Sequence, residues 1–139
     1  SHIRFNDYIT NLVQNLVHSY EVKTDDTKLK LNVEDIDLAL DQAIPCGLIL
    51  NELITNSLKY AYPIGKGGEI TIEVTEKEGK IKMLVKDHGV GLPKSFKISE
   101  TDSLGLSLVD TLIDQLDGEL ILKTESGTEF LIIFEKQEF

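Results

Sequence analysis

An aspartate at the end of an apolar strand is the first residue whose setting indicates chemistry. Ile81, Met83, Val85 and Asp87 alternate along a predicted strand, so the carboxylate of Asp87 points to the same face as three apolar side chains. A carboxylate in that setting is costly unless it accepts hydrogen bonds. It therefore either caps the turn that follows or accepts a hydrogen bond from a ligand.

The turn after this strand favours a ligand. Its sequence is Asp87-His88-Gly89-Val90-Gly91-Leu92, and two glycines at this spacing let the backbone approach a bound molecule closely. A buried acceptor beside an apolar slot lined by backbone suits an adenine ring, whose exocyclic amino group is a hydrogen-bond donor. The turn indicates an adenine site, with a simple turn cap as the alternative.

A polar stripe on the longest predicted helix is the second candidate. Glu52, Asn56 and Lys59 stand at positions i, i+4 and i+7, so their side chains lie along one face. The amide oxygen of Asn56 suits Mg²⁺, which prefers hard oxygen ligands. Lys59 can neutralise phosphate charge, and Tyr60 offers a flat ring for stacking. The alternative is the ordinary solvated side of an amphipathic helix.

A helix start is the third candidate. The segment Ser103-Leu104-Gly105-Leu106 opens an apolar helical pattern, and the first amides of a helix bind anions with the help of its dipole. Gly105 leaves access to those amides open. The glycine-rich run at 65–68 lacks the spacing of a Walker A motif and is typical of a surface turn.

Hydrophobic periodicity predicts the elements that must position these residues. Helices are predicted over residues 5–20, 44–61 and 104–117. Pro45 suits the first turn of the second helix, and Gly118 suits a left-handed stop after the third. Strands are predicted over 28–33, 36–40, 69–76, 80–87, 119–125 and 128–135, with turns at 24–26, 78–79 and 126–127 and a loop over 88–103.

This order of elements predicts one domain of the α+β class. Runs of strand and helix in this sequence fit a two-layer α/β sandwich, in which helices pack on one face of a mixed sheet. A chain of 139 residues is long enough for a single core of this kind.

The composition excludes several classes of function. A net charge of −10, from 14 basic and 24 acidic residues, disfavours binding to nucleic acid or directly to an anionic membrane. No apolar run approaches the roughly 18 residues of a membrane-spanning helix. The single cysteine, Cys46, permits no intrachain disulfide and indicates a cytoplasmic location. A polyanion would have to bind through local amides, single lysines and a metal ion.

Together the three candidates resemble the motifs of histidine kinases. Residues 51–60 resemble the N box, 87–92 the G1 box, 103–109 the G2 box and 127–130 the closing Gly-Thr strand of the Bergerat (GHKL) ATPase fold. The Asn-Glu-Leu-x-Thr-Asn form of the first motif resembles the HisKA_2 or HWE-like subgroup. The resemblance implies the catalytic domain of a sensor histidine kinase of a two-component system, which transfers the γ-phosphate of ATP to a histidine in a separate upstream domain.

The resemblance also implies roles for individual residues. Asp87 would accept a hydrogen bond from adenine, Asn56 would ligate Mg²⁺, and Glu52 would be the general base that polarises the attacking histidine or a water molecule. Residues 93–102 would form the ATP lid. The other positions expected to contact ATP or ADP are Lys59, Tyr60, Gly89, Gly91, Leu92, Lys94, Lys97, Leu104, Gly105, Leu106 and Thr128.

Three departures from the family pattern bear on these expectations. His88 stands where Asn or Asp is usual, and it is expected to face outward. Ser103 replaces the first glycine of the G2 box. No H box is present, because the context of His18 does not resemble the phosphoacceptor motif, so the chain by itself is expected not to autophosphorylate.

The expected partners are an upstream dimerisation and histidine-phosphotransfer domain and the receiver domain of a response regulator, within a full-length homodimer. The helix over 5–20 either belongs to the catalytic sandwich or adjoins that upstream domain. Two alternatives stay open. One is another protein of this fold, such as an anti-sigma-type serine kinase or an ATP hydrolase, and the other is an interaction module that binds no nucleotide.

Overall fold

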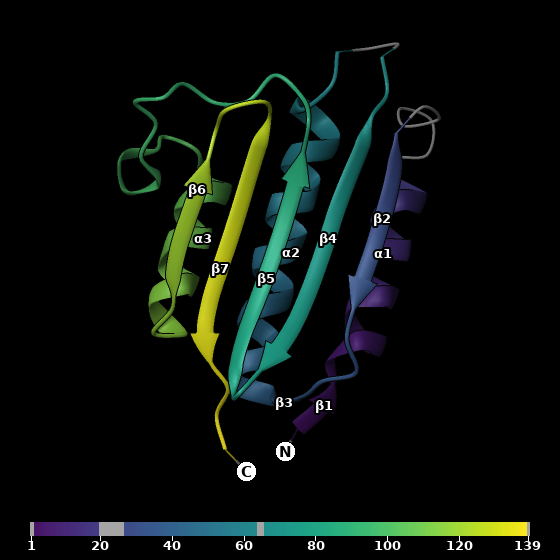
Figure 1. Ribbon diagram of the computed structural model, residues 1–139, viewed down its shortest axis with the longest axis vertical. Coiled ribbons are helices and arrows are strands. Elements are labelled where there is room, and N and C mark those ends of the chain that lie inside the picture. Colours follow the sequence, from purple (N-terminus) through teal and green to yellow (C-terminus); the bar gives the residue numbers. More distant parts are fainter. Residues whose placement is uncertain (1, 20–26, 64–65, 139) are drawn as a thin grey trace.

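The computed structural model describes residues 2–19, 27–63 and 66–138, and in this part of the chain three helices pack on one face of a five-stranded sheet (Figure 1). The strand order is β2-β4-β5-β7-β6, with β2 and β4 parallel and the other neighbours antiparallel. The predicted two-layer α+β sandwich with a mixed sheet is therefore confirmed.

The strands of this sheet lie close to their predicted positions. They are β2 (Lys28–Val33), β4 (Glu69–Lys77), β5 (Lys80–Asp87), β6 (Glu119–Lys123) and β7 (Thr128–Glu135). The predicted end of β6 at residue 125 is wrong, because the pairing of β6 with β7 stops at Lys123. Glu78 and Gly79 close the β4–β5 hairpin, as predicted, and both have positive φ. The turn predicted at 24–26 lies outside the described residues.

A second, two-stranded sheet joins β1 (His2–Arg4) to β3 (Asp37–Ala39). The sequence predicted an extended segment over 36–40, but Leu40 already belongs to the following helix. β1 was not predicted, because a three-residue strand shows no measurable periodicity and forms only through pairing with a distant segment.

The central helix α2 (Leu40–Tyr60) begins before the predicted start at 44. Pro45 therefore lies inside the helix, and its expected place in the first turn is wrong. A proline at this position removes the backbone hydrogen bond to the carbonyl of Asp41 and normally costs stability. The ring of Pro45 is buried, so apolar packing offsets part of that cost.

The outer helices are α1 (Phe5–Ser19) and α3 (Leu104–Gln115). The residue in the left-handed conformation after α3 is Asp117 (φ 50°), not Gly118 as predicted. Gly118 instead donates its N–H to the carbonyl of Ile113 at 3.0 Å, which closes the last turn. Aspartate tolerates this conformation better than most residues.

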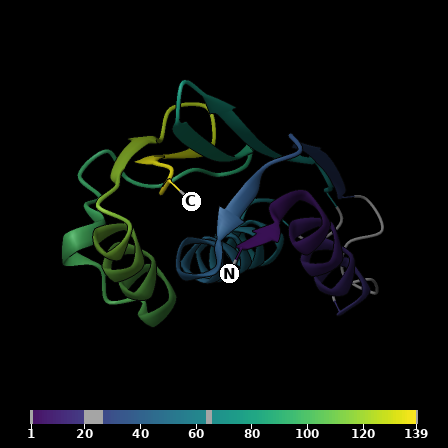
Figure 2. The ribbon, with the colours of Figure 1, turned by 90° about the horizontal axis from the view of Figure 1, so that it is seen from below.

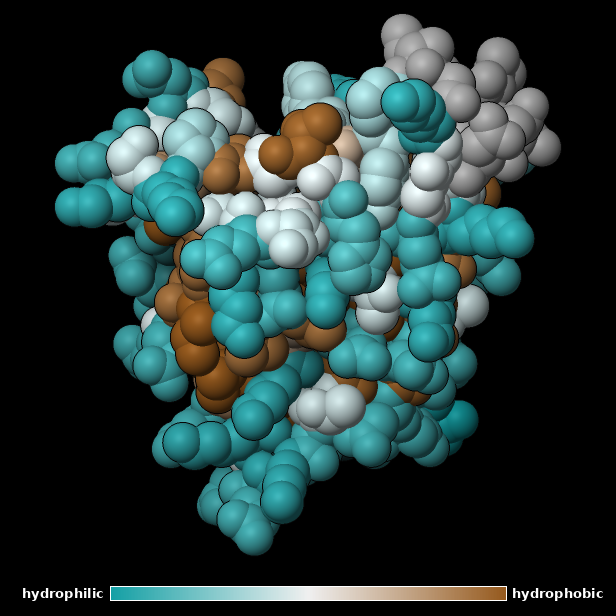
Figure 3. Space-filling model, turned by 45° about the horizontal axis from the view of Figure 1, so that its top comes forward, coloured by the Kyte–Doolittle hydropathy of each residue, from teal (hydrophilic) through white to brown (hydrophobic). Residues whose placement is uncertain are grey.

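The core lies between the sheet and the helices, with α2 in the middle of the helical layer (Figure 2). Alternate strand residues and the inner face of α2 are fully buried: Ile49, Leu50, Leu53, Ile70, Ile72, Val74, Ile81 and Met83. The opposite face of the sheet carries no helix from the described residues, and its surface is mostly hydrophilic with apolar side chains between (Figure 3). No helix in the described part of the chain has the length and apolar character of a membrane span.

This topology brings three chain segments together at one end of the sandwich, the upper end in Figure 1. The last turn of α2, the end of β5 and the first residues of β7 meet there, and α3 starts beside them. These segments carry the candidate residues from the sequence.

Candidate functional site

Asp87 is the one buried polar or charged side chain among the described residues, with 4% of its surface exposed. Its Oδ1 accepts hydrogen bonds from the backbone N–H of Gly89 at 3.0 Å and of Thr128 at 3.3 Å. Its Oδ2 accepts one from the hydroxyl of Ser57 at 3.0 Å. The aspartate thus caps its own turn through Gly89 and is also fixed by β7 and α2, and these three donors offset the cost of burying the charge.

One acceptor position of this carboxylate receives no hydrogen bond from the described residues. An ionised carboxylate has about four lone-pair sites, and two on Oδ1 and one on Oδ2 are engaged. Asp87 also lines a cavity of about 340 Å³, which is within the usual size of small-molecule sites. We call it the Asp87 cavity; its other lining residues are Leu53, Asn56, Ser57, Tyr60, Ala61, Val90, Gly91, Leu92, Ser103, Leu106, Thr128 and Phe130.

The two glycines of the turn after β5 have different structural roles. A Cβ atom on Gly89 would collide with the carbonyl oxygen of Ala61, and the next residue, Val90, donates its N–H to that same oxygen at 2.8 Å. Gly89 therefore lets the turn lie on the end of α2 and is not among the residues that line the cavity. Gly91 does line the cavity and has a φ of 72°, a conformation that glycine adopts without strain.

Tyr62 fixes the same turn from the other side. Its hydroxyl accepts a hydrogen bond from the backbone N–H of His88 at 2.9 Å and donates one to the carbonyl of Glu69 at 2.7 Å. Its ring lies directly over Gly68. The side chain of His88 is exposed, as expected from the sequence.

The start of α3 carries a side-chain cap. Ser103 accepts a hydrogen bond from the N–H of Leu106 at 3.2 Å, so one amide expected to bind phosphate is already engaged by the residue that replaces the usual glycine. A Cβ atom on Gly105 would lie 2.5 Å from Oε2 of Glu52. The absence of a side chain at Gly105 thus lets Glu52 reach the first turn of α3. Leu104 is 89% exposed and does not line the cavity.

The expected cationic residues lie outside the cavity. Lys59, Lys94 and Lys97 are exposed, and Lys94 lines a separate surface hollow next to Lys123. The expected lid, residues 93–102, contains the short 3-10 helix η2 (Ile98–Glu100), and Phe96 and Ile98 pack against the core. The approach of these lysines to phosphate stays a prediction.

The structure brings seven of the predicted site residues together around the cavity: Asn56, Tyr60, Asp87, Gly91, Leu92, Leu106 and Thr128. It places Glu52 and Gly105 in contact beside the cavity. The sequence did not single out Ser57 or Tyr62. Ser57 falls on the buried side of α2 at helical spacing from Leu53, and a hydroxyl there is the one signal that could have indicated it.

A metal ion at this site would need phosphate oxygens of a bound nucleotide as further ligands. No group of three or more His, Cys, Asp or Glu side chains in the described part of the chain could hold a metal. The amide of Asn56 lines the cavity near the start of α3. This single hard ligand fits Mg²⁺, which keeps several waters and binds through one or two protein groups together with phosphate oxygens.

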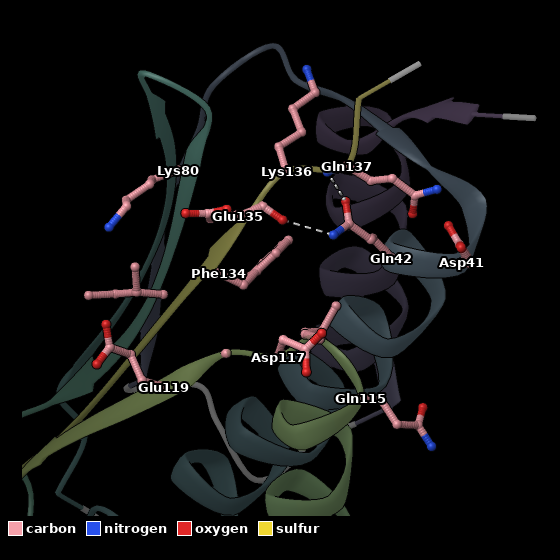
Figure 4. Close-up of a pocket in the computed structure, with 13 residues that line it drawn as sticks. Asp41, Gln42, Lys80, Gln115, Asp117, Glu119, Phe134, Glu135, Lys136 and Gln137 are labelled. Atoms are coloured by element: carbon pink, nitrogen blue, oxygen red, sulfur yellow. Dashed lines mark hydrogen bonds between the residues drawn. The ribbon is translucent and has the colours of Figure 1, made fainter.

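A larger cavity, about 690 Å³, lies at the opposite end of the sandwich (Figure 4). There the side chain of Gln42 donates to the carbonyl of Glu135 at 3.0 Å and accepts from the N–H of Gln137 at 2.8 Å. These bonds attach the C-terminal segment to α2. The described residues around this cavity carry exposed charges of both signs but no buried acceptor, so it lacks the feature that distinguishes the Asp87 cavity.

Comparisons with known proteins identify the family of the chain. The chain belongs to the family of histidine kinase-, DNA gyrase B- and HSP90-like ATPases, which matches residues 41–138. The sensor histidine kinase PdtaS of Mycobacterium tuberculosis is 32% identical over 118 residues, which cover 81% of this chain and 24% of PdtaS. Blue-light-activated histidine kinase 2 of Erythrobacter litoralis is 26% identical over 106 residues, 76% of this chain and 30% of that protein.

Solved structures show the same fold. The histidine kinase domain of the Erythrobacter litoralis EL346 kinase superposes with a TM-score of 0.89 at 22% identity, over 96% of this chain and 62% of that one. The catalytic domain of histidine kinase ThkA gives a TM-score of 0.74 at 22% identity, over 98% of this chain and 96% of that one. The fold is that of a histidine kinase catalytic domain, and the chain spans about a quarter of the length of PdtaS.

Proposed function

We propose that this chain is the ATP-binding catalytic domain of a sensor histidine kinase and presents the γ-phosphate of ATP to a histidine in another domain. The observation that carries the proposal is the buried carboxylate of Asp87, which keeps an open acceptor position at the wall of a mostly apolar cavity. The family and the sensor histidine kinases among its relatives support it. The expected partners are an upstream dimerisation domain and a receiver domain.

Adenine recognition follows from the charge and shape of the cavity. Asp87 accepts hydrogen bonds from three donors, and a carboxylate offers a ligand only acceptor positions. An adenine amino group can donate to the open position on Oδ2. Apolar side chains on the cavity wall, such as Leu53 and Phe130, exclude water and cover the flat ring. The exposed ring of Tyr60 stands at the rim, where it can flank the base.

Phosphate binding is assigned to the end of the cavity next to α3. The free amides and the dipole of that helix favour an anion, and Asn56 would hold Mg²⁺ against the phosphate oxygens. When bound, Mg²⁺ neutralises charge that develops on the transferred phosphoryl group. The lysines of the lid are further candidates for contact with phosphate.

Glu52 is the proposed general base. Its carboxylate lies against Gly105 at the start of α3, beside the expected phosphate position. From there it can accept the proton of an incoming imidazole while the imidazole nitrogen attacks the γ-phosphorus and the bond to the ADP oxygen breaks. Positioning supplies most of the rate of such a transfer. A cytoplasmic location, with ATP at hand, is part of this proposal.

Thermal unfolding with and without Mg²⁺-ADP tests the proposal. ADP at one hundred times its dissociation constant should stabilise the folded state by about 2.7 kcal/mol. The chain by itself should acquire no stable label from γ-labelled ATP, and addition of the upstream histidine domain should restore labelling of that domain. Unfolding that ADP does not change, up to millimolar concentration, would contradict ATP binding and leave an interaction module.

One other function has a specific observation in its favour. The anti-sigma F factor of Geobacillus kaustophilus is 28% identical over 61 residues, which cover 44% of this chain and 42% of that protein. A kinase that phosphorylates serine on a partner protein would use the same cavity. The acid stability of the product separates the two activities, because phosphoserine survives acid and phosphohistidine does not.

A further inference from the structure

Ser57 has no role in the function proposed so far, yet among the described residues it is the side chain that hydrogen-bonds to Asp87. It is half-buried on α2, lines the Asp87 cavity and donates its hydroxyl hydrogen to Oδ2 of Asp87 at 3.0 Å. The two backbone donors, Gly89 and Thr128, both bind Oδ1. Oδ2 is therefore the oxygen that has an acceptor position left, and Ser57 lies next to it.

While its hydrogen is donated to Asp87, the hydroxyl of Ser57 can only accept a hydrogen bond from a ligand in the cavity. A serine hydroxyl has one hydrogen and two lone pairs, and the hydrogen is engaged by Asp87. The cavity wall at this point consequently presents two neighbouring acceptors, the Oγ of Ser57 and the Oδ2 of Asp87. An exocyclic amino group has two N–H bonds and is complementary to such a pair.

We infer that Ser57 is a specificity-determining residue that makes the cavity select a 6-aminopurine over a 6-oxopurine. The inference rests on the proposed function, because it assumes that the cavity binds a purine nucleotide. The 6-oxo group of hypoxanthine is an acceptor and would face two acceptors. Ser57 could donate to it only by releasing Asp87, whose buried Oδ2 would then lose its donor. An unpaired buried acceptor is costly, so sites of this kind discriminate strongly.

The experiment compares ADP with inosine diphosphate, which differs in its 6-oxo group and N1 proton. Calorimetric titration in the presence of Mg²⁺ gives both dissociation constants for the wild-type chain and for Ser57→Ala, Ser57→Thr and Ser19→Ala. Ser57→Thr keeps the hydroxyl. Ser19→Ala is the matched control, because it removes a serine hydroxyl bond from an exposed position on α1.

The wild-type chain should prefer ADP by at least about 100-fold. Ser57→Ala should lower ADP affinity by about 10-fold and leave the affinity for inosine diphosphate unchanged or raised. The preference should thus fall by about 10-fold or more. Ser57→Thr should retain the preference, and Ser19→Ala should leave both affinities unchanged.

Two results would overturn the inference. If Ser57→Ala weakened the affinities for ADP and inosine diphosphate equally, Ser57 would have a purely structural role. If the affinity for ADP were unchanged, Ser57 would have no role in binding. Alanine favours helix more than serine does, so the variant should fold, and its thermal unfolding confirms this. A wild-type chain that binds neither nucleotide would contradict the proposed function itself. A chain that binds ADP without the expected effect of Ser57→Ala would contradict only the inference about Ser57.

Discussion

Replacement of Asp87 by asparagine should abolish most nucleotide affinity and leave the fold intact. The amide oxygen of the new side chain can accept the two backbone hydrogen bonds that now reach Oδ1, from Gly89 and Thr128. Its NH₂ group then takes the place of Oδ2, and the hydroxyl of Ser57 can turn to accept from it. Each buried polar group keeps a partner, so the free energy of unfolding should change by about 1 kcal/mol or less.

Binding is affected differently, because the amide presents a donor where the adenine amino group also donates. Loss of a hydrogen bond to a charged group costs about 1.5–3 kcal/mol, which corresponds to roughly a 10- to 100-fold weaker affinity for ADP. The assay is calorimetric titration of Asp87→Asn with Mg²⁺-ADP, together with thermal unfolding of the free variant. Asp114→Asn is the matched control, since Asp114 is exposed on α3.

The control should bind ADP as the wild type does. An affinity of Asp87→Asn within about threefold of the wild type would refute the reasoning, because it would remove Asp87 from contact with the base. Unfolding of the variant at room temperature would show that the three hydrogen bonds to the Asp87 carboxylate are required for the stability of the fold. In that case the loss of binding would no longer report on adenine recognition.

Other parts of the structure give three more testable expectations. Asn56→Ala should weaken ADP binding in the presence of Mg²⁺ and leave Mg²⁺-free binding unchanged; equal calorimetric losses under both conditions would contradict its ligand role. Gly89→Ala should destabilise the fold by about 2–4 kcal/mol, because the new methyl group meets the carbonyl of Ala61. Denaturant unfolding should show a smaller loss, about 1–2 kcal/mol, for Gly79→Ala, where φ is positive but the space is open. Cys46 should react with a thiol reagent only as fast as the chain unfolds, because burial raises the pKa of its thiol; rapid labelling of the native chain would be inconsistent with this burial.

The part of the site that local pattern determines could be predicted from the sequence. Asp87 follows three apolar residues at period two, and this alternation fixes the face to which its carboxylate points. The same pattern predicted β5 and the hairpin before it, whose bounds the structure confirms. The outward position of His88 follows likewise from its place after a buried strand residue.

The start of α2 could not be predicted in this way, since proline is most common in the first turn of a helix. The sequence favoured a start near Pro45, but the segment from Leu40 is also helical and places Ala43 in the core. Burial of Ala43 and the hydrogen bonds of Gln42 to the C-terminal segment outweigh the preference of one residue. Propensity is a weak guide where tertiary packing decides.

Contacts between segments that are distant in the sequence also could not be predicted. Ser57 and Asp87 are 30 positions apart, and no local rule pairs a helix serine with a strand carboxylate. The side chain of Lys94 lines a hollow with Lys123 in the described structure, although its place in the lid suggested phosphate. The direction of an exposed lysine depends on how the whole loop packs, which the sequence pattern does not encode.

A structure of the chain with bound ADP and Mg²⁺ tests the central claim most directly. We expect the adenine ring inside the Asp87 cavity, with its amino nitrogen within hydrogen-bond distance of Oδ2 of Asp87 and of the Oγ of Ser57. The phosphates should lie toward Asn56 and the start of α3. A base bound outside this cavity, or one whose amino group makes no contact with Asp87, would contradict the claim.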